Sequence, residues 1–253
     1  MEHTGHYPFF TASVLPMTDM FAKVTLGPLL LAQGLYTRWV TPRLPEADGP
    51  RQGRHADASG PALRLLILGD SAAAGVGALT QDEAIAGRLV AGLAGDFQLS
   101  WQLRAQSGLD SRQLFQLLED GPAEPFDVAL VSIGVNDVTS TIAAAEWQAR
   151  ISRLIALLSE RFEARHIVFL PVPPMHLFPA LPQPLRWYLG LRARRFNSLL
   201  VELLAGQDRC ALLATRFQPA AGLMAGDGFH PSPALYRILA DEAVRVIRQR
   251  CNR

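Results

Sequence analysis

The sequence predicts an α/β domain in which helices cover both faces of a parallel sheet of five strands. Three observations lead to this prediction. Strand-like and helix-like segments alternate from Leu63 onward, most of the strand-like segments are continuously apolar, and no repeat of fixed period is visible. A strand that is apolar on both faces is expected inside a parallel sheet, because helices then shield both of its sides from water.

Five strands and five helices are expected in this domain. The strands are predicted at residues 65–68, 97–104, 126–133, 167–170 and 211–214. The helices are predicted at residues 80–93, 111–119, 147–162 and 185–204, and from residue 233 onward. Thr80 and Glu83 fit a capping box, in which two side chains satisfy free backbone N–H groups, and this predicts where the first helix begins. Ser232 followed by Pro233 is typical of a helix start and predicts the beginning of the last helix.

The strand at residues 97–104 differs from the others, because apolar and polar side chains alternate along it. Such a strand has one wet face and is expected near an edge of the sheet. With this strand at the edge, the five strands fit the order 2-1-3-4-5 of a flavodoxin-like three-layer sandwich. That order opens a crevice beyond the carboxyl ends of strands one and three. Functional side chains are therefore expected in the loops that follow these strands.

Composition and charge restrict the function. The net charge of +1 gives no general footprint for nucleic acid, so no nucleic-acid partner is expected. The basic stretch at residues 186–195 is interpreted as the solvated face of a helix. Cys210 and Cys251 are too few for a disulfide framework, and no spacing of Cys or His suggests a metal site. Neither a metal nor another cofactor is expected.

Residues 1–61 are interpreted as an N-terminal extension and linker, in front of the main domain at residues 62–253. Residues 24–37 form an uncharged run within a helix expected at about residues 20–40, and this run is shorter than the roughly 20 apolar residues of a membrane-spanning helix. Three interpretations stay open: an extension packed on the domain, an anchor at a membrane surface, or an atypical export signal. The expected location is the cytoplasm or the periphery of a membrane, with export left open. The Pro, Gly and charged residues of the segment at 41–61 are typical of a linker.

Four loops that should meet at the crevice contain chemically useful residues. Ser71 follows the first strand, Gly108 the second and Asn136 the third, while Asp227 and His230 precede the last helix. A serine hydroxyl becomes a nucleophile when a base such as His230 takes its proton, and Asp227 can orient that imidazole. Backbone N–H groups at Ser71 and Gly108, with the Asn136 amide, can stabilise a developing negative oxygen. Together these residues fit nucleophilic acyl transfer.

Each of these residues alone would more often be an ordinary turn or loop residue, so only the ordered set is informative. The set consists of Gly69-Asp-Ser71, Gly108, Gly134-x-Asn136-Asp137 and Asp227-x-x-His230. It resembles the four motif blocks of the SGNH, or GDSL-type, serine hydrolases, and the resemblance extends over roughly residues 63–250. It implies the SGNH hydrolase fold and a serine-dependent ester hydrolase. Ser71 would be the nucleophile, His230 the base and Asp227 its orienting partner, with an oxyanion hole at Ser71, Gly108 and Asn136.

The sequence defines the substrate less well than the reaction. Ala72 and Ala73 stand where members of the family often have bulkier residues after the nucleophile, which leaves room beside the reacting carbon. The loop at residues 171–190 is rich in Pro and apolar side chains, among them Leu177 and Phe178. It is either a lid or binding wall, or a segment folded onto the core. If it borders the crevice, we expect small-molecule carboxylic esters of short to medium acyl chains, as in carboxylesterases, lysophospholipases or thioesterases.

Other functions are weighed against this one. A carbohydrate acetyl esterase of the same superfamily is the alternative, although it would need more aromatic and polar groups on the crevice loops than Trp187 and Tyr188 supply. A non-catalytic binding module on this fold is also open. A phosphate-binding P-loop is disfavoured, because no Gly-Lys-Ser or Gly-Lys-Thr ends the glycine-rich stretch. The nucleophile elbow of an α/β-hydrolase is disfavoured by Ala73, where that motif has glycine.

Overall fold

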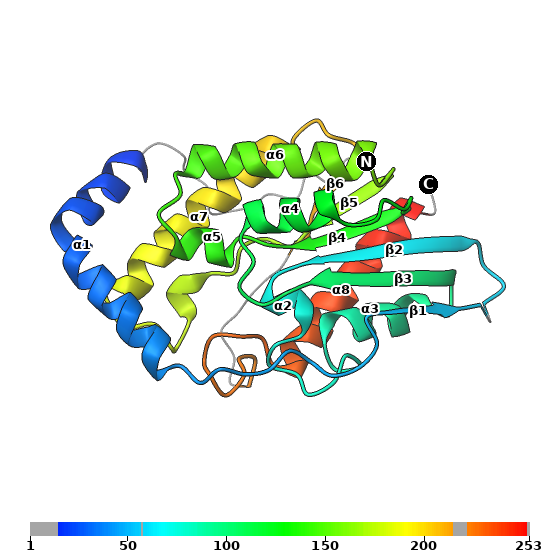
Figure 1. The fold of residues 1–253 in the computed structure, drawn as a ribbon, viewed down its shortest axis with the longest axis horizontal. Coiled ribbons are helices and arrows are strands. Elements are labelled where there is room, and N and C mark those ends of the chain that lie inside the picture. Colours follow the sequence, from blue (N-terminus) through cyan, green and yellow to red (C-terminus); the bar gives the residue numbers. More distant parts are fainter. Residues whose placement is uncertain (1–14, 57, 215–221, 252–253) are drawn as a thin grey trace, which may run out of the picture.

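The computed structural model describes residues 15–56, 58–214 and 222–251. Its centre is a six-stranded sheet with the strand order β1-β3-β2-β4-β5-β6 (Figure 1). The strands are β1 (Gln52–His55), β2 (Ala62–Gly69), β3 (Gln98–Ala105), β4 (Val128–Ser132), β5 (His166–Phe169) and β6 (Cys210–Leu212). The five strands from β2 to β6 are parallel and have the order 2-1-3-4-5 that the sequence predicts, so the fold class is confirmed.

Helices cover both faces of the sheet. They are α1 (Leu15–Val40), α2 (Ser71–Ala74), α3 (Ile85–Leu93), α4 (Ser111–Asp120), α5 (Val135–Thr139), α6 (Ala144–Glu160), α7 (Leu185–Leu204) and α8 (Pro233–Cys251), with a 3₁₀ turn η1 at Met175–Leu177. Helices α3 and α8 pack together on one face, and α4, α6 and α7 pack on the other (Figure 1). Within the described ranges, no helix has the length and apolar character needed to span a membrane.

The alternation of side chains along β2 divides the core into two hydrophobic clusters. Leu66 and Leu68 belong to the cluster under α6 and α7, whereas Leu65 and Ile67 belong to the cluster under α3 and α8. All four side chains are fully buried. Successive side chains of a strand point to opposite faces of the sheet, so a central strand covered on both sides must be apolar at every position. This requirement explains the continuous apolar run in the sequence.

The segment at residues 41–61 is more than a linker, because it contributes strand β1 to the sheet. β1 pairs antiparallel with β3, so β3 is not the edge strand that the sequence predicts. Gly53 permits the pairing, since a Cβ at this position would lie 2.8 Å from Nε1 of Trp101. β1 has only four residues, Gln-Gly-Arg-His, and none of them is strongly apolar. Its formation therefore depends on the open hydrogen-bonding edge of β3 and not on a local pattern.

The capping box predicted at Thr80 and Glu83 is wrong, because α3 begins only at Ile85. The intervening Gln81 is buried, and its Nε2 donates at 3.1 Å to the carbonyl oxygen of Ala47 and at 3.1 Å to another carbonyl oxygen in α2. These two bonds tie the N-terminal segment to the main domain. Residues around Gln81 are thereby held in turns, and the helix starts one turn later than predicted.

The basic stretch at residues 186–195 is not wholly a solvated face, because Arg192 is only 4% exposed. Its Nε donates to the carbonyl oxygen of Val138 at 2.9 Å, and its Nη2 donates to that of Ile142 at 2.8 Å. Its guanidinium also lies 5.4 Å from the ring centre of Phe196. Arg192 therefore fixes the chain between α5 and α6 against α7. No local sequence pattern distinguishes it from the neighbouring arginines.

Helix α1 packs against α7 at the left end of the molecule in Figure 1. Leu30 is buried against the domain. Gln33 holds the start of α7, since its Oε1 accepts from the N–H of Leu185 at 3.0 Å. The N–H groups in the first turn of a helix lack partners within the helix, so this contact satisfies one of them. Residues 25–40 therefore fit the interpretation of an extension packed on the domain.

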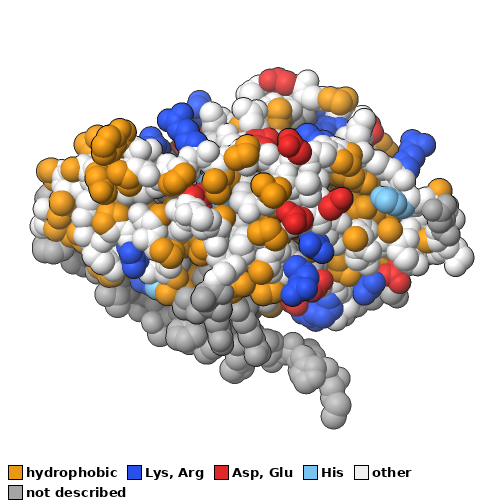
Figure 2. Space-filling view, turned by 90° about the horizontal axis from the view of Figure 1, so that it is seen from below, with side chains coloured by type: hydrophobic (Ala, Val, Ile, Leu, Met, Phe, Trp, Pro, Cys, Tyr) orange, Lys and Arg blue, Asp and Glu red, His pale blue; other side chains and the backbone are white. Residues whose placement is uncertain are grey.

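Much of the exposed surface of α1 is apolar. Its exposed large hydrophobic side chains are Leu29, Leu31, Leu35, Tyr36, Trp39 and Val40. Figure 2 shows hydrophobic side chains gathered at the left end of the molecule, the end at which α1 lies in Figure 1. The membrane-surface anchor and the export signal stay predictions. Residues 1–14, which begin the predicted extension, lie outside the described residues.

Replacing Arg192 by Met should lower the free energy of unfolding by about 2–4 kcal/mol, because two buried carbonyl groups lose a charged donor. Urea unfolding followed by circular dichroism measures this loss. Arg195→Met is the matched control, on the same helix but partly exposed, and should change the stability by less than about 0.5 kcal/mol. Equal effects of the two substitutions would contradict the role given to Arg192.

Candidate active site

Ser71 stands where β2 passes directly into α2. Gly69 ends the strand with a φ of +153°, and a Cβ at this position would lie 2.0 Å from the carbonyl oxygen of Ser132 in β4. Only glycine tolerates both this backbone conformation and this close approach. Asp70 then caps α2, since its Oδ1 accepts from the N–H of Ala72 at 3.1 Å. This junction fixes Ser71 as the first residue of α2.

His230 connects Ser71 with Asp227. Its Nε2 lies 2.9 Å from Oγ of Ser71, and its Nδ1 lies 2.5 Å from Oδ2 of Asp227. Both separations are hydrogen-bond distances. With its proton on Nδ1, a neutral imidazole donates to the carboxylate and can accept the serine proton at Nε2. The loop before α8 thus brings a base and its orienting group to a serine in the first third of the chain.

Asp227 is held by its own loop. Its Oδ1 accepts from the N–H groups of Phe229 at 2.9 Å and of His230 at 3.0 Å. Burial alone would raise the pKa of Asp227, but hydrogen bonds from His230 and Phe229 outweigh burial and lower the pKa below its ordinary value. The carboxylate is therefore ionised at neutral pH and can stabilise a positive charge on the imidazole.

The two loops expected to supply oxyanion donors are tied to each other. Nδ2 of Asn136, in α5, donates to the carbonyl oxygen of Leu109 at 2.8 Å. The same amide nitrogen has a second N–H, which can serve another acceptor. The buried carboxylate of Asp137 accepts from the N–H of Ser111 at 3.0 Å and from its hydroxyl at 2.6 Å. Gly108 has a φ of +88°, and nothing lies within 4 Å of the place a Cβ would occupy, so it borders open space.

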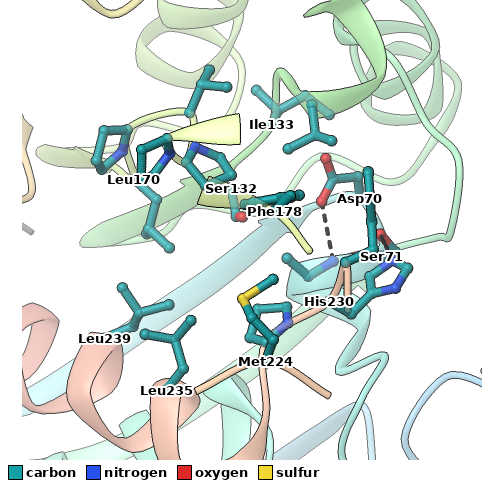
Figure 3. Close-up of a pocket in the computed structure, with 18 residues that line it drawn as sticks. Asp70, Ser71, Ser132, Ile133, Leu170, Phe178, Met224, His230, Leu235 and Leu239 are labelled. Carbon is teal, nitrogen blue, oxygen red and sulfur yellow. Dashed lines mark hydrogen bonds between the residues drawn. The ribbon is translucent and has the colours of Figure 1, made fainter. Parts of the chain in front are cut away.

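A pocket, here named the apolar pocket, opens beside Ser71 with an empty volume of about 770 Å³, its mouth included. Figure 3 shows Ser71 and His230 at one end of it and Leu235 and Leu239 of α8 at the other. Other apolar side chains also line it, namely Ile133, Val135, Leu170, Val172, Phe178, Met224 and Phe229. Such a pocket suits a hydrocarbon chain whose carbonyl end reaches the serine.

Three residues are expected from the sequence to bind substrate, and the structure separates them. Ala72 and Phe178 line the apolar pocket, whereas Leu177 is not among its lining residues, and its role in substrate binding stays a prediction. Leu177 ends the 3₁₀ turn η1, and Phe178 follows it. A 3₁₀ turn rotates successive side chains by about 120°, so neighbouring residues do not face the same wall. The loop at residues 171–190 is nevertheless a wall of the pocket over part of its length.

The sequence analysis does not predict two features of the site, namely part of the pocket lining and a buried carboxyl group. Met224, from the loop before α8, and Leu235 and Leu239, from α8 itself, line the apolar pocket, and no sequence signal identifies them. Asp70 is buried, and its Oδ2 has no hydrogen-bond partner among the described residues. Burial raises the pKa of Asp70 to about 7. The sequence contains one indication of this buried carboxyl group, namely an acidic residue that closely follows the apolar run at residues 65–68.

Comparisons with known proteins give one consistent result. The family model of the GDSL-like Lipase/Acylhydrolase family matches residues 67–238. A GDSL-like esterase of Mycobacterium tuberculosis is 29% identical over 254 residues, which cover 91% of this chain and 79% of the relative. A solved structure of a lipolytic G-D-S-L family member from Veillonella parvula matches with a TM-score of 0.60 at 17% identity, over 73% of this chain and 98% of that one. A solved acetylxylan esterase from Geobacillus stearothermophilus matches with a TM-score of 0.52 at 20% identity, over 74% and 94%.

Asp70→Asn should gain stability relative to the wild type as the pH rises from about 4 to about 7. The pKa of Asp70 is about 7 in the folded protein and near 3.8 in the unfolded chain, so within this range the folded state holds a proton that the unfolded chain has lost. Stability from the protonated carboxyl is therefore lost as the pH rises through the range. Asn removes the titration and keeps an oxygen for the N–H of Ala72.

The gain of Asp70→Asn should reach up to about 4 kcal/mol at pH 8 and vanish below about pH 4. Urea unfolding of both proteins at pH 4, 6 and 8 measures the difference. A difference that is the same at all three pH values would show that Asp70 does not titrate in this range.

Proposed function

The chain belongs to the GDSL-like lipase/acylhydrolase family and is an esterase, and we propose that it hydrolyses carboxylic esters of short to medium acyl chains through an acyl-enzyme on Ser71. The observation behind this proposal is the hydrogen-bonded series from Ser71 through His230 to Asp227, at one end of the apolar pocket. A nucleophile, a base and a group that orients the base are what serine acyl transfer needs.

In the first half of the proposed reaction, Oγ of Ser71 attacks the ester carbonyl carbon while its proton moves to Nε2 of His230. The imidazole becomes positively charged, and the ionised Asp227 stabilises it through the contact with Nδ1. The negative oxygen of the tetrahedral intermediate is held by the N–H groups of Ser71 and Gly108 and by the amide of Asn136. His230 then returns the proton to the leaving alcohol as the carbon–oxygen bond breaks.

In the second half, water takes the place of the alcohol. His230 removes a proton from the water as its oxygen attacks the acyl carbon, and a second tetrahedral intermediate forms. This intermediate collapses to the free acid as His230 returns the proton to Oγ of Ser71. Each half uses the same donors, so one set of preorganised groups serves both.

The lining of the apolar pocket supports the proposal that an acyl chain binds there. Hydrocarbon burial contributes about 0.8 kcal/mol per methylene, whereas sugar hydroxyls would need polar partners that such walls do not supply. The alternative proposal, a carbohydrate acetyl esterase, is kept because a solved acetylxylan esterase shares the fold. The non-catalytic binding module that the sequence alone leaves open does not agree with the esterase assignment of this family.

Ser71→Ala and His230→Ala should each lower kcat for a p-nitrophenyl ester by several orders of magnitude while the proteins stay folded. Asn136→Ala should lower kcat by about 10²–10³ because one oxyanion donor is lost. A fluorophosphonate probe should label the wild type and leave Ser71→Ala unlabelled. Ser152→Ala, at an exposed serine of α6, is the control and should behave like the wild type. Full activity in Ser71→Ala would exclude the assigned nucleophile.

Hydrolysis of p-nitrophenyl esters should improve from acetyl to medium acyl chains and then decline as the chain outgrows the apolar pocket. Leu239→Phe fills the far end of that pocket and should move the optimum to a shorter chain. Ile238→Phe is the matched control, because Ile238 is exposed on the same helix, and should leave the optimum in place. If acetyl esters are the best substrates of the wild type, the acetyl-esterase alternative replaces the acyl-pocket proposal.

A further inference from the structure

A second cavity, here named the α1 groove, lies between α1 and α7 and has an empty volume of about 1390 Å³, its mouth included. Phe229 lines both this cavity and the apolar pocket, so the two lie on either side of one side chain. Ser71 and His230 line the apolar pocket, whereas Asn136 lines the α1 groove. With the roles proposed above, a carbonyl carbon bonded to Ser71 with its oxygen on Asn136 lies between the two cavities. The two arms of such an ester then extend into different cavities.

One wall of the α1 groove lies outside the residues that the family model matches. The family match covers residues 67–238, whereas α1 ends at Val40. α1 is nevertheless fixed against the domain, because Gln33 bonds to the backbone of α7 and Leu30 is buried. The N-terminal extension therefore builds a surface next to the active site and does more than pack on the domain.

The two cavities differ in the chemistry of their walls. The apolar pocket offers few polar groups besides the catalytic ones. The α1 groove combines the hydroxyls of Thr37, Thr139 and Thr141 with the leucine side chains of Leu31 and Leu35 on α1. The hydroxyls of Thr37 and Thr139 donate to backbone carbonyl oxygens, so their free lone pairs can accept from a hydroxyl group of a ligand, and leucines can cover an alkyl chain. An amphipathic molecule matches this lining better than a plain hydrocarbon or a free sugar.

We propose that the α1 groove binds the alcohol side of the ester substrate, and that this alcohol is amphipathic, with oxygen atoms near the ester and an alkyl chain farther out. A partial glyceride ester has this chemistry. The inference rests on the proposed function, because it needs Ser71 as the nucleophile and the acyl chain in the apolar pocket. When the acyl bond to Ser71 forms and the ester carbon–oxygen bond breaks, His230 gives its proton to the alcohol oxygen. The alcohol then leaves along the α1 groove before water attacks.

The test keeps the acyl group constant and varies the alcohol. Methyl, butyl and octyl hexanoate are compared, at concentrations where the esters are dispersed as single molecules. Their leaving groups are all primary alkoxides, so differences report binding of the alkyl chain. For the wild type, kcat/KM should rise at least about tenfold from the methyl to the octyl ester, since each buried methylene contributes up to about 0.8 kcal/mol.

Two variants remove apolar surface from the wall, Leu35→Gln and Leu31→Gln. Both side chains are exposed, so the folded state should survive their replacement. The readout is the ratio of kcat/KM for the octyl and methyl esters, which a general loss of active enzyme does not change. The ratio should fall several-fold in each variant. In the wild type, the two hydroxyls that distinguish glyceryl monohexanoate from propyl hexanoate should raise kcat/KM.

Leu29→Gln is the matched control, with the same substitution on the same helix. Leu29 lies about 200° around the helix from Leu31 and does not line the α1 groove, so the octyl-to-methyl ratio should equal that of the wild type. An unchanged ratio in Leu35→Gln and Leu31→Gln would overturn the inference and leave the groove to another occupant, such as a second copy of the chain. Failure of the proposed function would look different, because no ester would be hydrolysed through Ser71 in any of the proteins.

Discussion

At the end of β2, the backbone of Gly69 approaches the carbonyl of Ser132 so closely that no side chain fits between the two strands. The N–H of Asp70 donates to the same carbonyl oxygen at 3.1 Å, which continues the pairing of β2 with β4 by one residue. Because the strands are locked together here, the turn into α2 has little freedom, and Ser71 emerges beside the loop that contains Asn136. The proposed nucleophile and oxyanion donor are therefore positioned by one strand pairing, to which the loop before α8 adds the imidazole.

Three buried aspartates near the junction of β2 and α2 show how the number of hydrogen-bond donors around a carboxyl group affects its charge. Asp227 receives two backbone N–H bonds and the contact with His230, and its pKa is lowered despite burial. Asp137 receives two bonds from Ser111, but burial dominates and its pKa is raised. Asp70 receives one bond from Ala72, and burial raises its pKa to about 7. One residue type thus supplies an ionised orienting group, a clamp between loops and a group that titrates near neutrality.

The features predicted correctly from the sequence are those that depend on the chain's own periodicity. Apolar runs give the five parallel strands, and the alternation along β3 places it outermost among these five, whereas the roles of Ser71 and Asn136 stay predictions. The failures share a different cause. β1 forms because β3 offers it an edge, α3 starts late because Gln81 binds a segment far away in the chain, and Arg192 is buried because α5 offers carbonyl oxygens. Each depends on a partner distant in sequence, which local patterns cannot contain.

The same division separates catalysis from substrate selection. The groups that would perform the chemistry lie at strand ends and in the loop before α8, where motif and fold constrain one another. The walls of the two cavities come from α1, from the loop after β5 and from α8, which have ordinary helix and loop sequences. Ser71 lines one cavity and Asn136 the other, so in the proposed binding mode the ester bond lies between them and each arm of the substrate meets its own wall. A substitution in one wall can then alter selection for one arm while the other arm and the reacting groups keep their contacts. Specificity in this chain is therefore free to change without disturbing the strand pairing on which the active site depends.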